Sequence, residues 1–376
     1  MARYRDRLCA DIVSCRPLLA QFGGCVPDLV DSIYLGGGTP SLLPEAELKK
    51  LFSALAGEFN LAPEVEITVE CAPATLTEPV LETLVACGVN RVSLGVQSFV
   101  DQEAASVARL HTREKVLRDI ECLCRSGITN INVDLIAGLP HQTRESWACS
   151  LDQAISTQVP HISVYMLEID DDSRLGRELI AGGNRYHAHF VPDEDDTAEF
   201  YETACAHLAG NGIGQYEISN FSRPGFESHH NLKYWDRQAY LGFGVDAHSM
   251  LPASESLAAK EIASIRLATT DSFDDFFNDA QVKAHEVTVD EALEERFFLG
   301  LRLNRGIKLS ELSEKFGPRL RKYSVVIAEL VTDGMLAQTG DVLQLTERGR
   351  LLSNEVFEKF IQIPEDAVAA DIADRR

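Results

Sequence analysis

The residues of this chain that are best suited to chemistry are polar side chains beside short apolar runs. Glu70 directly follows the run Val65–Val69, Gln97 ends a second run, and Asp134 lies inside a third. A buried carboxylate needs a hydrogen-bond donor or a cation, because an unpaired buried charge is very unfavourable. The amide of Gln97 both donates and accepts, which suits a sugar hydroxyl or an amide of a ligand. Around one opening, these groups would recognise an ammonium group and a ribose.

Two arginines and a glycine loop extend this set. Arg109 and Arg113 flank His111 and are suited to hold a carboxylate. The segment Gly36–Pro40 reads Gly-Gly-Gly-Thr-Pro, and glycines let a ligand approach the main chain closely. No lysine follows at the phosphate-binding position, so this is not a Walker nucleotide-binding loop.

These residues stand at equivalent places in a regular alternation of strands and helices. Short β-branched runs predict buried parallel strands at 32–35, 65–69, 91–96, 131–136 and 162–167, with a further strand at 215–221. Helical patterns cover 44–57, 77–87, 101–108, 113–126 and 144–157. The alternation predicts a parallel sheet with right-handed crossovers, and its spacing favours an open or closed α/β barrel. Barrels of this kind carry their chemistry at the carboxyl ends of the strands.

The chain changes character toward its C-terminus. Residues 1–255 are predicted to form the α/β barrel and its extension. Residues 256–287 are weakly patterned and are expected to be a connector. In residues 288–376, helices accompany a hairpin of 335–338 with 342–345, an arrangement that resembles a winged helix. The acidity of the chain favours a structural or partner-docking role for this domain over DNA binding.

Composition argues against several classes of protein. The chain has 376 residues, 45% hydrophobic and 25% charged, as expected of a globular protein. Its net charge of −23 disfavours binding to nucleic acid or anionic lipid, because phosphates would be repelled. No run of roughly 18 apolar residues predicts a transmembrane segment, and no secretory core follows the charged N-terminus, so the cytoplasm is the expected location. The cysteines are scattered and match neither a disulfide framework nor a zinc motif.

Seven segments together resemble one known family. They are GGGTPS, VSLGVQSF, RLHTRE, VDLIAGLPHQT, QYEISNF, HHNLKYW and LGFGVDAHS. Their combination resembles the oxygen-independent coproporphyrinogen III oxidase family of radical S-adenosylmethionine (SAM) proteins. The pattern HNxxYW, which begins here at His230, resembles the HemW-type heme chaperones within that family. The likeness covers nearly the whole chain, including its C-terminal part.

The resemblance implies a fold and a SAM site. The fold would be a partial (β/α)6 radical SAM barrel that lacks its first strand and cluster loop, followed by the family's mainly helical C-terminal domain. The residues implied to contact SAM are Gly37, Gly38, Thr39, Glu70, Gln97, Arg113, Asp134, Met166 and His248. Among these, Arg113 would meet the carboxylate of SAM, and Met166 and His248 would lie on the adenine side.

For function, the resemblance implies a chaperone that binds heme and delivers it to heme-accepting respiratory proteins. His230 offers an axial ligand for heme iron, and Tyr234 and Trp235 offer aromatic surface for stacking. The structural alternative is that this segment only packs the mouth of the barrel. The alternative function is an oxygen-independent coproporphyrinogen III oxidase that cleaves SAM in porphyrin biosynthesis, and a scaffold without SAM affinity is a third. The resemblance leaves room for a homodimer.

One feature of the family is missing from this sequence. Family members hold a [4Fe–4S] cluster with C-x3-C-x2-C, since thiolates ligate such clusters, and the motif occurs nowhere here. Cys9, Cys15 and Cys25 have the wrong spacing. Only 35 residues precede Gly36, fewer than the family's spacing requires, so the cluster loop is expected upstream of Met1. A start assigned too late and a genuinely cluster-free protein both remain open. The chain as given is not expected to be catalytic or to ligate the cluster.

Overall fold

The computed structural model describes residues 2–168, 177, 188–278 and 281–361. Residue contacts divide the chain into two units. The first, called the sheet unit, comprises residues 31–52 and 61–230, and the second, called the terminal unit, comprises residues 1–30, 53–60 and 231–376.

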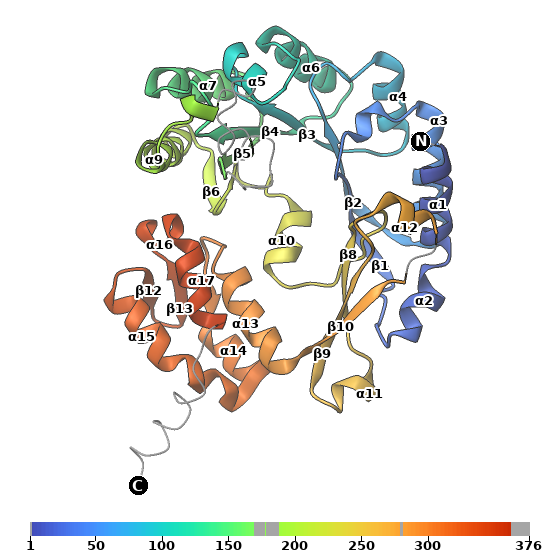
Figure 1. Ribbon diagram of the computed structural model, residues 1–376, viewed down its shortest axis with the longest axis vertical. Coiled ribbons are helices and arrows are strands. Elements are labelled where there is room, and N and C mark those ends of the chain that lie inside the picture. Colours follow the sequence, from blue (N-terminus) through green and yellow to red (C-terminus); the bar gives the residue numbers. More distant parts are fainter. Residues whose placement is uncertain (1, 169–176, 178–187, 279–280, 362–376) are drawn as a thin grey trace. The chain divides into compact units, whose positions relative to one another are not determined.

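A seven-stranded sheet forms the centre of the sheet unit (Figure 1). Its strands are β1 (Leu29–Leu35), β2 (Asn60–Cys71), β3 (Arg91–Gln97), β4 (Asn130–Ala137), β5 (His161–Met166), β6 (Gly214–Glu217) and β7 (Asn220–Ser222), in the spatial order β1-β2-β3-β4-β5-β7-β6. The strands β2 to β5 pair in parallel, whereas β7 runs antiparallel to both β5 and β6. All five predicted barrel strands are found. The single strand expected at 215–221 is instead the hairpin of β6 and β7.

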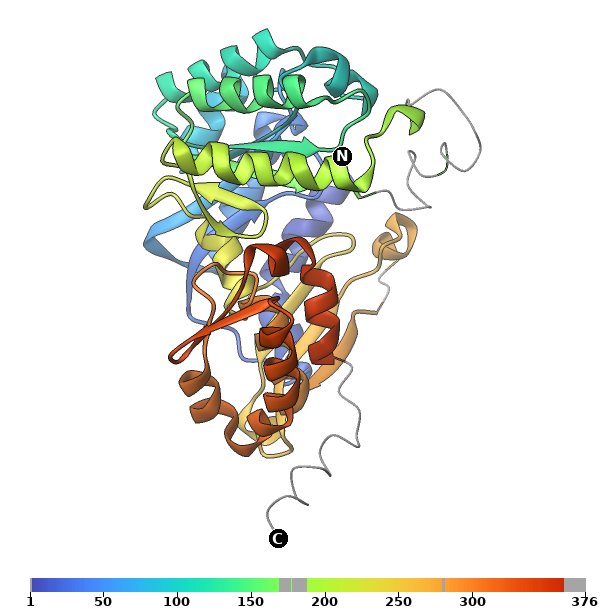
Figure 2. The same cartoon turned by 90° about the vertical axis from the view of Figure 1, so that its left-hand side faces the viewer.

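Helices connect successive strands and cover one side of the sheet (Figure 1, Figure 2). They are α3 (Glu45–Glu58), α4 (Glu78–Ala86), α5 (Asp101–Ser106), α6 (Arg113–Arg125), α7 (Arg144–Ser156) and α9 (Glu194–Gly210), with the 3-10 turns η1 (Pro40–Leu42) and η2 (Ala188–Phe190). Every helix predicted between the strands is present. The acidic first turn of α9 is capped by Asp193, which accepts from the amide of Asp196 at 2.8 Å. Negative side chains there are stabilised by the positive end of the helix dipole.

The two faces of this sheet differ in chemistry, because successive strand residues point to opposite sides. The helix-covered face is apolar and includes Val69, Leu94, Val133 and Val164, none more than 1% exposed. The other face carries polar side chains, although strands of parallel sheets are commonly apolar on both faces. The sheet curls into a half-barrel with its helices outside (Figure 1). This confirms the expected incomplete α/β barrel.

The terminal unit contains two N-terminal helices and a small antiparallel sheet. The helices are α1 (Ala2–Val13) and α2 (Cys15–Gln21), and the strands are β8 (His248–Pro252), β9 (Ile262–Ala268) and β10 (Lys283–Thr288), in the order β10-β9-β8, with α11 (Glu255–Ala258) and α12 (Phe273–Phe277) between them. Residues 256–287, expected to be a connector, therefore supply two strands. The sequence pattern does not predict β9, because its buried apolar residues follow no single period. Ile265 comes three positions after Ile262, and Leu267 comes two positions after Ile265. The predicted domain limits stay a prediction.

The rest of the terminal unit is helical with a small wing. Its elements are α13 (Val289–Gly300), β11 (Ile307–Lys308), α14 (Leu309–Phe316), η3 (Gly317–Tyr323), α15 (Ser324–Thr332), β12 (Leu336–Thr339), β13 (Val342–Leu345), α16 (Glu347–Leu351) and α17 (Ser353–Ile361). The predicted helices and hairpin are confirmed. The buried rings of Phe297, Tyr323 and Phe360 pack together in its core. In the part of the chain that the structure describes, no helix has the length and apolar character needed to cross a membrane.

Candidate functional site

The polar face of the sheet gathers side chains from four neighbouring strands. They are Glu66, Thr68 and Glu70 on β2, Arg91 and Ser93 on β3, Asn132 and Asp134 on β4, and His161, Ser163 and Tyr165 on β5. Thr68 Oγ1 and Arg91 Nε are buried there without a hydrogen-bond partner among the described residues. Buried polar groups are normally paired. Unpaired groups on a mainly polar face, to which Ile136 of β4 also belongs, therefore indicate a surface that takes up a polar ligand.

Glu70 is held on this face by two hydrogen-bond donors. The phenol of Tyr34 on β1 donates to Glu70 Oε1 at 2.8 Å, and the backbone N–H of Gly37 also bonds the carboxylate. Burial raises the pKa of Glu70, the bond from Tyr34 lowers it, and the charge of Asp134 raises it again. None of these influences comes from a cation. A positively charged ligand would therefore stabilise the ionised form of Glu70.

The glycine loop follows β1 and faces open space. A Cβ placed on Gly37 or Gly38 would meet no atom within 4 Å, so a ligand can reach the main chain there. Gly37 has a φ of +78°, a left-handed conformation that favours glycine. A Cβ on Gly36 would lie 2.8 Å from Glu70 Oε1, so any other residue there would displace the carboxylate from its place against this loop. Thr39 is half-buried and immediately precedes η1.

Asp134 is fixed by neutral donors. Ser93 Oγ donates to Asp134 Oδ2 at 3.0 Å and Asn132 Nδ2 donates to Oδ1 at 2.7 Å. Burial raises the pKa of Asp134, and hydrogen bonds from Ser93, Asn132 and Ser163, together with the charge of Arg91, offset this only in part. The fold therefore disfavours the ionised form, and a ligand that donates hydrogen bonds to it would relieve this penalty.

A neutral histidine orients the amide of Asn132. His161 Nδ1 lies 2.6 Å from Asn132 Oδ1, and its Nε2 lies 2.9 Å from Tyr216 Oη. Burial lowers the pKa of His161 well below its ordinary value, and the charge of Arg91 lowers it further. The imidazole is therefore neutral, so Nδ1–H donates to Asn132 and Nε2 accepts from the phenol of Tyr216. With its oxygen so engaged, the Asn132 amide presents its N–H groups to Asp134.

Gln97 ends β3 after a register shift that pairs it with Leu135 of β4, so strand alternation does not place its side chain. Its φ of +68° is uncommon for a residue with a side chain. A Cβ on Gly95 would lie 3.3 Å from Gln97 Nε2 and 3.9 Å from the guanidinium of Arg109, so both side chains pack over that glycine. Arg113 begins α6 with an exposed side chain, and its backbone N–H donates to Asp101 Oδ1 at 2.7 Å. Arg109 is the arginine placed beside Gln97, and the carboxylate role of Arg113 stays a prediction.

Met166 ends β5 and is half-buried. Strand alternation places it on the side of Ile162, opposite the side of Asp134. Tyr165 takes the position on the polar face instead: burial raises its pKa first, and the charge of Asp134 raises it further. Sequence reasoning selected Met166 by alignment with the family, whereas the two-residue period of the strand points to Tyr165. Contact of Met166 with SAM stays a prediction.

His248, expected on the adenine side of SAM, belongs to the terminal unit. It begins β8 with an exposed side chain. Its Nε2 lies 3.7 Å from Asp246 Oδ1, an ion pair only when the imidazole is protonated. The role of His248 also stays a prediction.

The helix α10 (His229–Trp235) begins in the sheet unit. Its first turn is bonded by Glu66 of β2, which accepts from the backbone N–H of His229 at 3.1 Å and from that of His230 at 3.0 Å. The first N–H groups of a helix have no partner within the helix, and a carboxylate there is also favoured by the helix dipole. A side chain more than 160 positions earlier thus fixes where α10 starts.

The imidazole of His230 is held against β1. Its Nδ1 lies 3.0 Å from Ser32 Oγ. Its ring stacks on Tyr34 with the centroids 5.0 Å apart and the planes inclined by 23°. Sequence reasoning missed Ser32, Tyr34 and Glu66, although a signal existed. Glu66 has the same strand parity as Glu70, and Ser32 the same parity as Tyr34.

The other two candidate heme contacts lie on the part of α10 that belongs to the terminal unit. Tyr234 packs edge-to-face on Tyr240 with the centroids 4.6 Å apart. The guanidinium of Arg302 lies over Trp235, 4.4 Å from the ring centroid, so one face of the indole is already occupied. Trp235 Nε1 is buried without a hydrogen-bond partner among the described residues. The proposed stacking of Tyr234 and Trp235 on heme stays a prediction.

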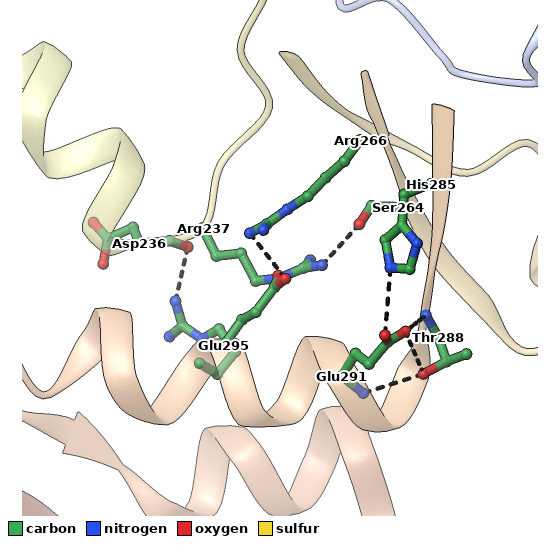
Figure 3. Close-up of polar contacts among 9 residues, drawn as sticks. Asp236, Arg237, Ser264, Arg266, His285, Thr288, Glu291 and Glu295 are labelled. Carbon is green, nitrogen blue, oxygen red and sulfur yellow. Dashed lines mark hydrogen bonds and ion pairs between the residues drawn. The ribbon is translucent and has the colours of Figure 1, made fainter. Parts of the chain in front are cut away.

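The chain that follows α10 is anchored by a buried ion network (Figure 3). Arg237 and Arg266 both bond the carboxylate of Glu295 on α13, and Arg237 also donates to Ser264 Oγ at 2.7 Å. The side chains of Arg237 and Glu295 are only 7% and 9% exposed. Here one buried acid has two cationic partners, which is the arrangement expected of a structural site.

The models of two protein families match parts of this sequence. The radical SAM superfamily matches residues 19–154, and the HemN C-terminal domain matches residues 287–352. The fold is similar to the solved coproporphyrinogen III oxidase (HemN) from Escherichia coli, with a TM-score of 0.77 and 22% identity over 96% of this chain and 82% of that one. At that identity the likeness concerns the fold. The chain is a radical SAM superfamily protein with a HemN-type C-terminal domain.

Relatives resolve the family further. The heme chaperone HemW of Lactococcus lactis is 33% identical over 349 residues, which are 92% of this chain and 88% of that protein. HemW of Bacillus subtilis is 35% identical over 89% of this chain and 86% of its own length. HemW of Escherichia coli is 29% identical over 88% of this chain and 84% of its own length. The chain belongs to the HemW family.

Membership of the radical SAM superfamily implies SAM and a [4Fe–4S] cluster. The residues present fit SAM, because Glu70 lacks a cation among its influences and the main chain at Gly37 and Gly38 is open to a ligand. They do not fit the cluster. Within the described ranges, no three His, Cys, Asp or Glu side chains are placed to hold a metal ion, and such clusters are ligated by thiolates.

Proposed function

We propose that this protein binds heme through His230 and passes it to hemoproteins. The observation that carries the proposal is the fixation of the His230 imidazole by Ser32 and Tyr34 on β1. A metal-bound histidine usually donates its second ring N–H to a fixed partner, which sets the tautomer and the ring orientation. With Nδ1 at 3.0 Å from Ser32 Oγ, the ligating nitrogen in this proposal is Nε2.

The same proposal places SAM on the polar face of the sheet. Glu70 receives the ammonium group, Gln97 and Asp134 receive ribose hydroxyls, and the main chain of Gly37 and Gly38 bonds the methionine end. When bound, SAM supplies a positively charged sulfonium and an ammonium group to this face. Support comes from the raised pKa values of Glu70 and Asp134, both of which a donating or cationic ligand would lower.

The recipients in this proposal are hemoproteins, by analogy with relatives that are named heme chaperones. That these recipients are respiratory proteins stays a prediction. The oxidase alternative has the support of the HemN fold at 22% identity, whereas two HemW relatives reach 33% and 35%. The chaperone is therefore the better supported function. A cytoplasmic location and a homodimer stay predictions.

Heme titration followed by the Soret band tests the heme site. We expect His230→Ala to shift the Soret band and to weaken heme binding at least about ten-fold, which corresponds to about 1.4 kcal/mol. His229→Ala is the matched control, because it removes the neighbouring exposed imidazole and leaves the backbone bond to Glu66 in place. Wild-type affinity and an unchanged Soret band in His230→Ala would refute the proposed heme site.

A further inference from the structure

Tyr34 of β1 contacts both candidate ligand sites of the sheet unit. Its hydroxyl donates to Glu70 Oε1 at 2.8 Å, and its ring stacks on His230 with the centroids 5.0 Å apart. All three residues belong to the sheet unit. One side chain thus joins the carboxylate proposed to bind an ammonium group to the imidazole proposed to bind iron.

The hydroxyl of Tyr34 stays a hydrogen-bond donor. Burial raises the pKa of Tyr34 far above its usual value, and the charge of Glu70 and the bond to it raise it further. A Cβ on Gly36 would lie 2.7 Å from Tyr34 Cε1 and 2.8 Å from Glu70 Oε1. The Tyr34 ring and the Glu70 carboxylate therefore both pack against the backbone of Gly36. A displacement of one of them displaces the other.

On its other side, Tyr34 meets a histidine that has little freedom. The backbone of His230 is bonded to Glu66, its Nδ1 lies against Ser32 Oγ, and one face of its ring rests on Tyr34. Closely packed groups transmit a displacement because they have no free space to absorb it. A change in the position or electron density of the Tyr34 ring is therefore passed to the imidazole.

We propose that Tyr34 couples the two sites, so that a cation bound at Glu70 weakens heme binding at His230. This rests on the proposed function of both sites. A phenol that donates to a carboxylate is polarised and carries more electron density in its ring. An electron-rich ring face stabilises a nearby positive charge, such as that of an iron-bound imidazole. An ammonium group at Glu70 withdraws this stabilisation.

The expected size of the coupling is set by the single hydrogen bond from Tyr34 to Glu70 that transmits it. Couplings between sites are commonly about 5- to 150-fold, and one bond acting through one ring belongs at the low end, about five-fold. Coupling is reciprocal, so bound heme weakens the cationic ligand at Glu70 by the same factor. SAM binding would thus promote release of heme.

The test measures heme affinity by Soret titration in four forms of the full chain: wild type, Glu70→Gln, Tyr34→Phe and the double variant. Glu70→Gln removes the carboxylate charge without requiring SAM, and Tyr34→Phe keeps the ring and removes the hydroxyl. We expect Glu70→Gln to weaken heme binding about five-fold in the Tyr34 background and less than about two-fold in the Tyr34→Phe background. Saturating SAM should weaken heme binding about five-fold in wild type and much less in Tyr34→Phe.

Tyr201→Phe is the matched control. Its phenol is also buried in the sheet unit and donates to the carbonyl of Ile218 at 2.6 Å, but it lies on α9. This variant should leave heme affinity and the effect of Glu70→Gln unchanged. Equal effects of Glu70→Gln with and without the Tyr34 hydroxyl would overturn the coupling and leave the heme site intact. Heme binding that does not depend on His230 would overturn the proposed function and the coupling together.

Discussion

Acidic side chains that lie partly or wholly out of solvent occur in both units, and they are compensated in opposite ways. Glu295 in the terminal unit is bonded by two arginines, Arg237 and Arg266 (Figure 3). Glu70 and Asp134 in the sheet unit are bonded by a phenol, a hydroxyl, an amide and main-chain N–H. Burial raises the pKa of both sheet carboxyls. The charge of Asp134 raises the pKa of Glu70 further, whereas the charge of Arg91 offsets the rise at Asp134 only in part.

This difference separates a structural site from a site prepared for a ligand. A buried acid with bonded cations has its desolvation offset inside the fold, so removing it leaves charges without partners. A half-buried acid to which only neutral donors are bonded remains partly uncompensated, and perturbed groups of this kind concentrate where proteins bind or react. The uncompensated pair lies on the polar face beside the open glycine loop, where SAM is proposed to bind.

The largest effect should come from the compensated acid. Glu295→Ala leaves the buried Arg237 and the partly exposed Arg266 without their anion, and breaking a buried pair such as Arg237–Glu295 costs about 3–5 kcal/mol. We expect the free energy of unfolding to fall by about that amount, measured by chemical denaturation. Glu261→Ala is the control, because this exposed carboxylate bonds Arg319 at the surface and such pairs contribute little. Similar losses from both variants would remove the contrast between the two units.

Glu70→Gln should have the opposite profile, with a loss of binding and little loss of stability. The amide keeps a hydrogen-bond acceptor for Tyr34 but cannot attract an ammonium group. We expect SAM affinity, measured by isothermal titration calorimetry, to fall at least about ten-fold, or about 1.4 kcal/mol. Glu64→Gln, at an exposed position of the same strand, is the control and should bind SAM as wild type does. Unchanged SAM affinity in Glu70→Gln would show that this carboxylate is not the ammonium site.

The parallel strands and their helices could be predicted from the sequence because one face of each strand is apolar. Val92, Leu94 and Val96 recur at every second position of β3 and are fully buried beneath helices. Glu70, Gln97 and Asp134 could be selected because a polar residue within or at the end of such a run is unfavourable unless it has a partner. These local patterns carry enough information to give the barrel and the polar face.

The partners of His230 could not be predicted in the same way. Ser32 and His230 are 198 positions apart, and no local period in the sequence connects β1 to α10. Glu66 likewise reads as the polar position of a strand, and only the folded chain shows that it bonds the start of a helix. Contacts of this kind depend on tertiary packing, which overrides the local preferences of the residues involved.

The smallest predicted effect is a gain of stability in Asp134→Asn. The amide oxygen can still accept from Asn132, and the hydroxyl of Ser93 can turn to accept from the new amide N–H. No desolvated charge then remains at this position. We expect the thermal midpoint at neutral pH to rise by roughly 1–3 °C, together with weaker SAM binding, as is common when a binding residue is replaced for stability.

The pH dependence of this gain identifies its cause. Since folding raises the pKa of Asp134, the folded protein binds a proton at pH values where the unfolded chain, with a pKa of about 3.9, does not. Above the folded pKa the wild type is therefore destabilised relative to Asp134→Asn, and it regains stability as the pH falls through that pKa. Scanning calorimetry at a series of pH values should show the two midpoints converging toward acid pH. A lower midpoint in the variant, or a difference that does not change with pH, would mean that the Asp134 carboxylate supports the fold as Glu295 does.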